Sequence, residues 1–550
     1  MKGAQIVIEC LVEQGVDTVF GYPGGYVLDL FDELYKASGR IRQILTCHEQ
    51  GAAHAADGYA RASGKVGVVF ATSGPGATNL VTGIATAYMD SVPLVAVTGN
   101  VSVASLGRDS FQEIDIAGVT MPITKHNYIV KDVAELAETM REAFRIARSG
   151  RPGPVLVDIP KNIQQDDCPF TPRKPEPIGR KPAREGELDA AADLIGKAER
   201  PIIYYGGGVI SAGASAELVA FAEKADMPVA SSIMGLGGFP ASHPLFMGMI
   251  GMHGHAGITK ALLECDLIVT LGARFSDRVA GDRKRFFPQA KKIHIDVDDA
   301  ELNKNVESSA SVNADLKDAL PRLAAKIQGA ERPEWRKRCA DLLAAHPPKE
   351  SRADVSPQAV LKALNALHGG GIVATDVGQH QMWTAQTYRF EKPRALLTSG
   401  GLGTMGFGLG AAIGAAVATG ERVALVTGDG CFHMNMNELV TAAVYNLPVT
   451  TLVFNNNVLG MVYQWQKLFY GKRFSSTVLN RPTDYMKLAA ALGAKGFEIK
   501  KNAEIEGVLK KALAVKGPAL VNCLIGSEES VLPMIPAGKG AEAMILEIDN

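Results

Sequence analysis

Oxygen-bearing side chains follow two apolar segments in the last third of the chain. Gly428-Asp429-Gly430 comes after the apolar run 422–427, and Asn455-Asn456-Asn457 comes after the run 449–454. Carboxylate and amide oxygens suit Mg²⁺, which takes few protein ligands and shares substrate phosphates. Flanking glycines let backbone amides approach phosphates, and a helix expected from about Asn435 would aim its positive end at them. The pair of motifs predicts a magnesium–phosphate site, although Gly-Asp-Gly alone is also a common strand-to-helix turn.

A second candidate for chemistry is Glu49, within Cys47-His48-Glu49-Gln50-Gly51. It stands at the start of an expected helix of small residues that follows an expected strand at 41–45. A lone glutamate in this place is ordinarily an N-terminal cap, because its charge suits the positive end of the helix. The alternative is a general acid, and the residues alone leave both interpretations open.

Composition and charge exclude several classes of protein. The 550 residues include 57 Lys+Arg and 58 Asp+Glu, so the net charge of −1 argues against a nucleic-acid binder. Seven scattered cysteines without a C-x-x-C pair indicate a reduced, cytoplasmic protein without a zinc site. Residues 399–420 carry no charge, but their many glycines favour a buried helix over a membrane span.

Short apolar runs alternate with helical patterns along the whole chain, which predicts parallel sheets covered on both faces. Ten such runs lie at 66–71, 93–98, 155–159, 202–205, 267–271, 293–297, 372–374, 423–426, 449–454 and 519–525. A proline-rich linker at 168–187 and a second at 328–357, which brackets a short helix at 335–345, divide the chain. We therefore expect an α/β protein with three doubly wound parallel-sheet domains, at 1–165, 185–330 and 355–550.

The two strand-end motifs resemble the signature of thiamin diphosphate-dependent enzymes with the pyruvate oxidase/decarboxylase-like architecture. The resemblance covers the whole chain and sharpens to the acetohydroxyacid synthase (acetolactate synthase) catalytic subunit family. The stretches that carry it include Phe20-Gly21-Tyr22-Pro23-Gly24-Gly25, Thr72-Ser73-Gly74-Pro75-Gly76-Ala77-Thr78-Asn79, Asp376-Val377-Gly378-Gln379-His380-Gln381-Met382-Trp383 and Gly460-Met461-Val462-Tyr463-Gln464-Trp465-Gln466.

The resemblance implies roles for the three domains and for their residues. The first domain would bind the aminopyrimidine of thiamin diphosphate, the second FAD, and the third the diphosphate and Mg²⁺. Mg²⁺ would be held by Asp429, Asn456 and the backbone of Val458. The thiamin diphosphate contacts would be Glu49, Val377, Gly378, Gln379, His380, Gly403, Met405, Gly428, Asp429, Gly430, Asn456, Gly460 and Met461.

By the same resemblance the enzyme decarboxylates pyruvate and transfers the hydroxyethyl unit to a second pyruvate or to 2-ketobutyrate. This is the first common step of valine, leucine and isoleucine biosynthesis. Residues at the reaction centre would be Glu49, Gly25, Phe111, Gln112 and Lys161. Residues that contact the second substrate would be Arg278, Trp465, Met461 and Val377.

The central segment alone gives only a weak dinucleotide signal, because Gly206-Gly207-Gly208 and the strand-end Asp296 lack a full G-x-G-x-x-G motif. The resemblance adds FAD. Its contacts would be Arg151, Gly206, Gly207, Gly208, Ser232, Ile233, Gly251, Met252, His253, Gly272, Ala273, Arg274, Arg278, Asp296, Val297 and Asp315.

The resemblance also implies a homodimer or tetramer with active sites between subunits, with Glu49 and Asp429 of one site on different chains. A small regulatory subunit is a further expected partner, whereas nucleic acid and membrane are not expected. Two alternatives stay open: a flavin-free fermentative acetolactate synthase or another thiamin diphosphate-dependent pyruvate enzyme, and a catalytically inactive homologue.

Overall fold

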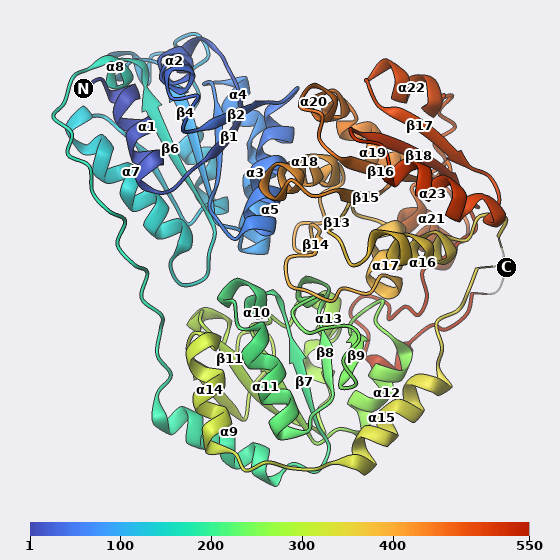
Figure 1. Ribbon diagram of the computed structural model, residues 1–550. Coiled ribbons are helices and arrows are strands. Elements are labelled where there is room, and N and C mark those ends of the chain that lie inside the picture. The colour runs from blue at the N-terminus through green and yellow to red at the C-terminus, as the bar shows by residue number, and fades with distance from the viewer. Residues whose placement is uncertain (352, 549–550) are drawn as a thin grey trace.

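The computed structural model describes residues 1–351 and 353–548, which form three parallel six-stranded sheets flanked by helices (Figure 1). This confirms the expected fold class. Each sheet lies within one of the three expected segments, while the limits of the domains stay predictions. The strands are β1 Thr18–Tyr22, β2 Arg42–Leu45, β3 Gly67–Ala71, β4 Leu94–Asn100, β5 His126–Ile129 and β6 Pro154–Pro160; β7 Pro201–Tyr205, β8 Val229–Ser231, β9 Phe246–Met249, β10 Leu267–Leu271, β11 Lys291–Asp296 and β12 Ala310–Asn313; β13 Val373–Thr375, β14 Leu396–Leu397, β15 Val423–Gly428, β16 Val449–Asn455, β17 Lys495–Ile499 and β18 Ala519–Leu524.

The order of the strands differs between the central sheet and the two outer ones. The first sheet runs β2-β1-β3-β4-β6-β5, and the third repeats that order as β14-β13-β15-β16-β18-β17. The central sheet runs β12-β11-β10-β7-β8-β9, the order of a dinucleotide-binding fold. In such sheets ligands bind beyond the carboxyl ends of the strands, where the strand order reverses. That point falls between β13 and β15 in the third sheet and between β7 and β10 in the central one.

The uncharged stretch at 399–420 contains helix α18 (Phe407–Thr419), which packs on α3 (Glu49–Ser63). Glycines bring the two backbones together: a Cβ at Gly414 would lie 1.8 Å from the carbonyl oxygen of Ala55. The pair joins the first and third domains of one chain (Figure 1). Among the described residues, no helix is long and apolar enough to cross a membrane.

The helix next to the Gly-Asp-Gly motif differs from the expectation. The structure has α19 (Asp429–Asn435) and then α20 (Glu438–Val444), so a helix starts at Asp429 rather than near Asn435. Gly428 is the extended N-cap residue, at φ −100° and ψ 161°, and the chain turns into the helix at once. A carboxylate in the first turn is favourable because it faces the positive end of the helix. The predicted metal ligand is thus itself a helix-start residue.

Both expected linkers are present. The segment before α9 (Glu185–Lys197) is extended and mostly exposed from about residue 169. The second linker holds the short helix α15 (Pro333–Ala345), and the indole nitrogen of Trp335 donates to the carbonyl of Pro201 at 3.0 Å. The second linker is therefore docked on the central domain rather than free.

Candidate active site

A cavity of about 440 Å³ lies at the carboxyl edge of the third sheet, at the point where its strand order reverses. Segments that follow β13, β15 and β16 form its wall. Apart from Gly403, every residue predicted in this domain for thiamin diphosphate lines the cavity, as does Val458. Gly403 is close by, since a Cβ on it would lie 3.8 Å from the side chain of Val377. The third sheet therefore gathers the predicted diphosphate and metal residues in one place.

The oxygen ligands expected for Mg²⁺ face this cavity. The backbone N–H of Gly430 donates to Asp429 Oδ1 at 3.0 Å, and the N–H of Val458 donates to Asn456 Oδ1 at 3.2 Å. Burial raises the pKa of Asp429 to about 6, because the charged carboxylate has lost water. A bound cation would offset this cost. Within residues 1–351 and 353–548 there is no cluster of three or more His, Cys, Asp or Glu suited to a metal.

Two buried polar atoms in the cavity have no hydrogen-bond partner among the described residues. They are Nε2 of His380 and Nε1 of Trp383, both on α17 (Gln379–Thr387). Burial lowers the pKa of His380 to about 3, so the ring is neutral. Unpartnered buried groups are rare in folded proteins, and they fit a site that receives a polar ligand. Trp383 was not among the predicted contact residues. The sequence feature that could have indicated it is its place at the end of the motif at 376–383.

Glycines shape the wall of the cavity. A Cβ on Gly460 would lie 2.0 Å from Gln379 Oε1, and one on Gly428 would lie 3.1 Å from His380 Nδ1. Gly378 has a φ of +150°, which side-chain-bearing residues rarely adopt. At Gly460 and Gly428 the absence of a Cβ thus leaves room for the side chains of Gln379 and His380, while the predicted approach of backbone to phosphate stays a prediction.

Glu49 is the first residue of α3 and is buried. The cap of this helix is His48, whose Nδ1 accepts from the N–H of Gln50 at 3.1 Å. The carboxylate of Glu49 instead accepts a hydrogen bond from Asn79 Nδ2 at 2.9 Å. His48 is therefore the N-cap residue, and Glu49 is a first-turn carboxylate whose hydrogen bond comes from Asn79. Glu49 is not one of the residues that line the cavity of its own chain.

The other predicted reaction-centre residues gather near the carboxyl edge of the first sheet. Lys161 Nζ lies 3.3 Å from the carbonyl oxygen of Gly25 and 2.5 Å from Asp29. Phe111 is 79% exposed, and a Cβ on Gly74 would lie 2.9 Å from the carbonyl of Gln112. Because its side chain is exposed, Phe111 can contact the surface of another protein chain.

The predicted flavin residues follow the carboxyl ends of all six central strands. Gly206–Gly208 follow β7, Ser232–Ile233 follow β8, Gly251–His253 follow β9, Gly272–Arg274 follow β10, Asp296–Val297 end β11, and Asp315 follows β12. At the reversal point the backbones touch: the N–H of Gly208 donates to the carbonyl of Gly272 at 3.0 Å. Arg151 reaches this edge from the first domain and pairs with Glu301 at 2.9 Å and Asp298 at 3.3 Å.

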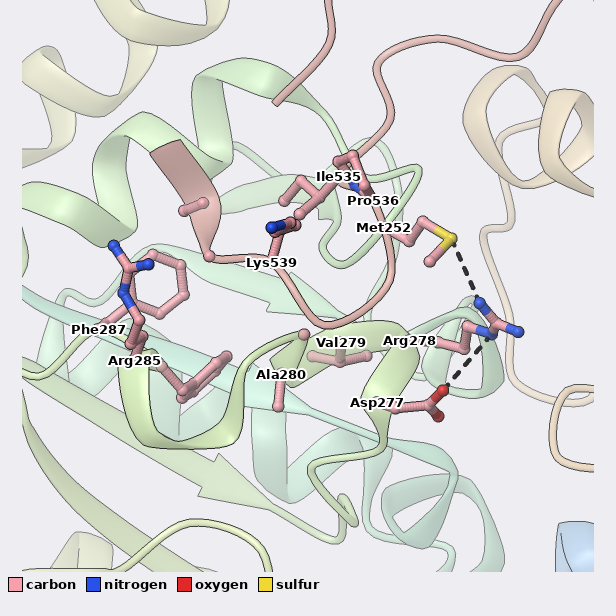
Figure 2. A pocket seen from close by; sticks show the side chains of 14 residues that line it. Met252, Asp277, Arg278, Val279, Ala280, Arg285, Phe287, Ile535, Pro536 and Lys539 are labelled. Carbon is pink, nitrogen blue, oxygen red and sulfur yellow. Dashed lines mark hydrogen bonds and ion pairs between the residues drawn. The ribbon is translucent and has the colours of Figure 1, made fainter. Parts of the chain in front are cut away.

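Arg278 lies in a different cavity, of about 380 Å³, between α13 (Asp277–Ala280) and the C-terminal residues 535–541 (Figure 2). Its guanidinium is 3.6 Å from the sulfur of Met252 and 3.9 Å from Asp277, and its side chain is 59% exposed. Arg278 thus lies beside the predicted flavin residue Met252, while Val377 and Met461 line the first cavity.

Trp465 lies on α21 (Gly460–Phe469), one turn after Met461 and on the same face of the helix. It is half-buried and packs edge-to-face on Phe469 with ring centroids 5.4 Å apart. Met461 lines the first cavity, and Trp465 does not.

Three family models match the chain, and they describe the N-terminal, central and C-terminal domains of thiamine pyrophosphate enzymes. They cover residues 1–119, 188–323 and 376–523. Sheets, cavity and matches together define an enzyme that uses thiamine pyrophosphate, the same compound as thiamin diphosphate.

Curated relatives are similar over nearly their whole length. A probable acetolactate synthase large subunit of Methanocaldococcus jannaschii is 47% identical, over 98% of this chain and 94% of the relative. The acetolactate synthase large subunit of Corynebacterium glutamicum is 45% identical, over 98% and 89%. The acetolactate synthase isozyme 1 large subunit of Escherichia coli is 43% identical, over 99% and 98%. The chain belongs to the acetolactate synthase large subunits of the thiamine pyrophosphate enzyme family.

Proposed function

We propose that this enzyme joins two molecules of pyruvate to give acetolactate and CO₂, and that 2-ketobutyrate serves as an alternative acceptor. The observation that carries the proposal is the cavity of the third sheet. It combines Asp429, Asn456 and Val458 with the unpartnered polar atoms of His380 and Trp383. Its products would enter valine, leucine and isoleucine biosynthesis.

The residues of this cavity divide the work of holding the cofactor. Asp429, the Asn456 side chain and the Val458 carbonyl hold Mg²⁺, and backbone amides around Gly428 and Gly430 face the diphosphate. Met405, which lines the same cavity, would contact the bound cofactor. Bound thiamin diphosphate would supply the carbon nucleophile and the electron sink for the loss of CO₂.

Glu49 supplies the one protein acid that this chemistry needs, as a hydrogen-bond and proton donor to the aminopyrimidine ring. Its absence from the cavity wall of its own chain supports a site built between two subunits, in which the Glu49 that completes a cavity belongs to the second chain. The exposed Phe111, with Gln112, Gly25 and Lys161 beside it, would then line the entrance from that same chain.

FAD binds at the central sheet, in our proposal, along the residues that follow its strand ends. The dinucleotide-type strand order and the backbone contact of Gly208 with Gly272 support this assignment. Arg278 holds the carboxylate of the second substrate, and Trp465, Met461 and Val377 contact its alkyl group. Because relatives are called large subunits, we also propose a small regulatory subunit as partner.

The test is an assay of acetolactate formed from pyruvate by the purified protein, with thiamin diphosphate, Mg²⁺ and FAD each left out in turn. We expect a yellow protein whose activity requires all three. A colourless and fully active enzyme would place it with the flavin-free fermentative synthases, and an inactive one would favour a homologue without catalysis.

A further inference from the structure

A buried carboxylate of the third domain lies against the segment that carries Glu49. Glu438 begins α20, and its side chain has no exposed surface. Its Oε2 accepts a hydrogen bond from the backbone N–H of Cys47 at 3.2 Å and one from the hydroxyl of Thr441 at 2.7 Å. Glu438 does not line the cavity, and the proposed chemistry gives it no part. The chemistry proposed above does not explain why a buried carboxylate of the third domain binds the backbone of the first.

Residues 45–51 contact α20 and its C-terminal end both before and after Glu49. Before it, the N–H of Leu45 donates to the hydroxyl of Tyr445 at 2.8 Å. After it, Gly51 lies so close to Glu438 that an added Cβ would be 2.2 Å from Oε1. Two hydrogen bonds, at Leu45 and Cys47, therefore hold the segment, and the glycine at position 51 leaves room for the carboxylate.

Glu438 also lies at the positive end of α3. Its carboxylate accepts a hydrogen bond from the N–H of Cys47, two residues before the first residue of this helix. A negative charge at the start of a helix is stabilising. Glu438 thus places a carboxylate from another domain at the start of the helix whose first residue is Glu49.

We infer that Glu438 is a positioning residue: it holds residues 47–51 and so sets the orientation in which Glu49 meets the aminopyrimidine ring. Glu438 lies on α20, which follows α19, and α19 begins at the proposed metal ligand Asp429. Within one chain, α19 and α20 therefore lie between its Asp429 and its Glu49, which in the proposed dimer serve two different cavities. The inference rests on the proposed role of Glu49.

The experiment measures exchange of the C2 hydrogen of bound thiamin diphosphate with D₂O, stopped by acid and read by NMR. Glu438→Ala should slow exchange by about 10- to 100-fold, the usual cost of a misplaced catalytic group, with little change in cofactor affinity. Glu49→Gln should slow exchange by about 10²- to 10⁴-fold, to a residual rate that is measured. The double variant should be no slower than Glu49→Gln alone, because Glu438 acts through Glu49. Glu13→Gln is the control, because Glu13 is a carboxylate at the end of α1 (Gly3–Glu13) that pairs with Arg141. This variant should exchange at the wild-type rate.

The outcomes separate the two proposals. Wild-type exchange in Glu438→Ala, with exchange slowed in Glu49→Gln, would overturn the positioning role and leave Glu49 in place. Wild-type exchange in Glu49→Gln would overturn the role of Glu49 itself. If Glu438→Ala does not fold, Gly51→Ala displaces the same carboxylate from the side of α3, and wild-type exchange in that variant would overturn the positioning role equally.

A second measurement uses the protein without cofactor. Cys47 is exposed, whereas the other cysteines are buried apart from Cys168, which is partly so. In a Cys168→Ser background, we expect iodoacetamide to label Cys47 several times faster after Glu438→Ala than after Glu438→Gln, because both variants remove the charge that raises the pKa of Cys47 and only Gln keeps an acceptor for its N–H. Equal labelling rates would show that Glu438 does not hold residues 47–51.

Discussion

The buried Asp429 makes a prediction about the protein without metal. Its pKa rises from an ordinary 3.8 to about 6 in the folded state, which corresponds to about 3 kcal/mol. Because the folded state binds this proton more tightly, the free energy of unfolding falls as pH rises from about 4 to about 6 and then levels off. Asp429→Asn keeps the acceptor for the Gly430 N–H and removes the charge. The cofactor-free variant should therefore be more stable than wild type at pH 8, by up to about 3 kcal/mol.

The assay is urea unfolding of both proteins without cofactors, followed by circular dichroism at pH 4, 6 and 8. The gain should vanish near pH 4, and Mg²⁺ with thiamin diphosphate should raise the midpoint of wild type only. Asp193→Asn, in an exposed ion pair with Lys197 on α9, is the matched control and should change little. A variant that is no more stable than wild type at pH 8 would refute the reasoning, because the charge of Asp429 would then not be costly.

Three further predictions concern the acid, the packing between domains and the second substrate. Glu49→Gln should lower turnover by about 10²- to 10⁴-fold while cofactor binding, followed by the fluorescence of Trp383, stays intact; near-normal turnover would contradict the assignment. Gly414→Ala should lower the free energy of unfolding by about 1–3 kcal/mol, since its Cβ meets the Ala55 carbonyl, whereas Gly507→Ala in the open part of α23 (Ile505–Leu513) should not, as thermal unfolding would show. Trp465→Leu should collapse a preference for 2-ketobutyrate of roughly 10- to 200-fold in competition with pyruvate, and an unchanged product ratio would reduce Trp465 to packing.

The strands that the sequence predicts are mostly the central ones. The ten apolar runs and the run at 41–45 coincide with strands, among them β4, β10 and β16, which are buried throughout. Of the strands that no run indicated, β5, β9, β12, β14 and β17 are edges of their sheets. An edge strand faces solvent on one side and needs no continuous apolar run; β12, for example, reads Ala-Ser-Val-Asn. Apolar runs thus miss most edge strands, and they also miss β1, which has a glycine, and β8, which is three residues long, although both are interior and largely buried.

The site shows the same limit in another form. Asp429, Asn456 and Gly378 are recognisable because each stands at a strand end, and parallel strands bring their ends to one edge whatever else the fold does. Glu438 has no such signal. Its role depends on α3 of one domain meeting α20 of another, nearly 400 residues away in sequence. Gly51 is a glycine where a side chain would collide with Glu438, but in the sequence it is one of many small residues in its helix. The ligands of a cofactor follow from one sheet, whereas the placement of an acid between domains follows only from the assembled chain.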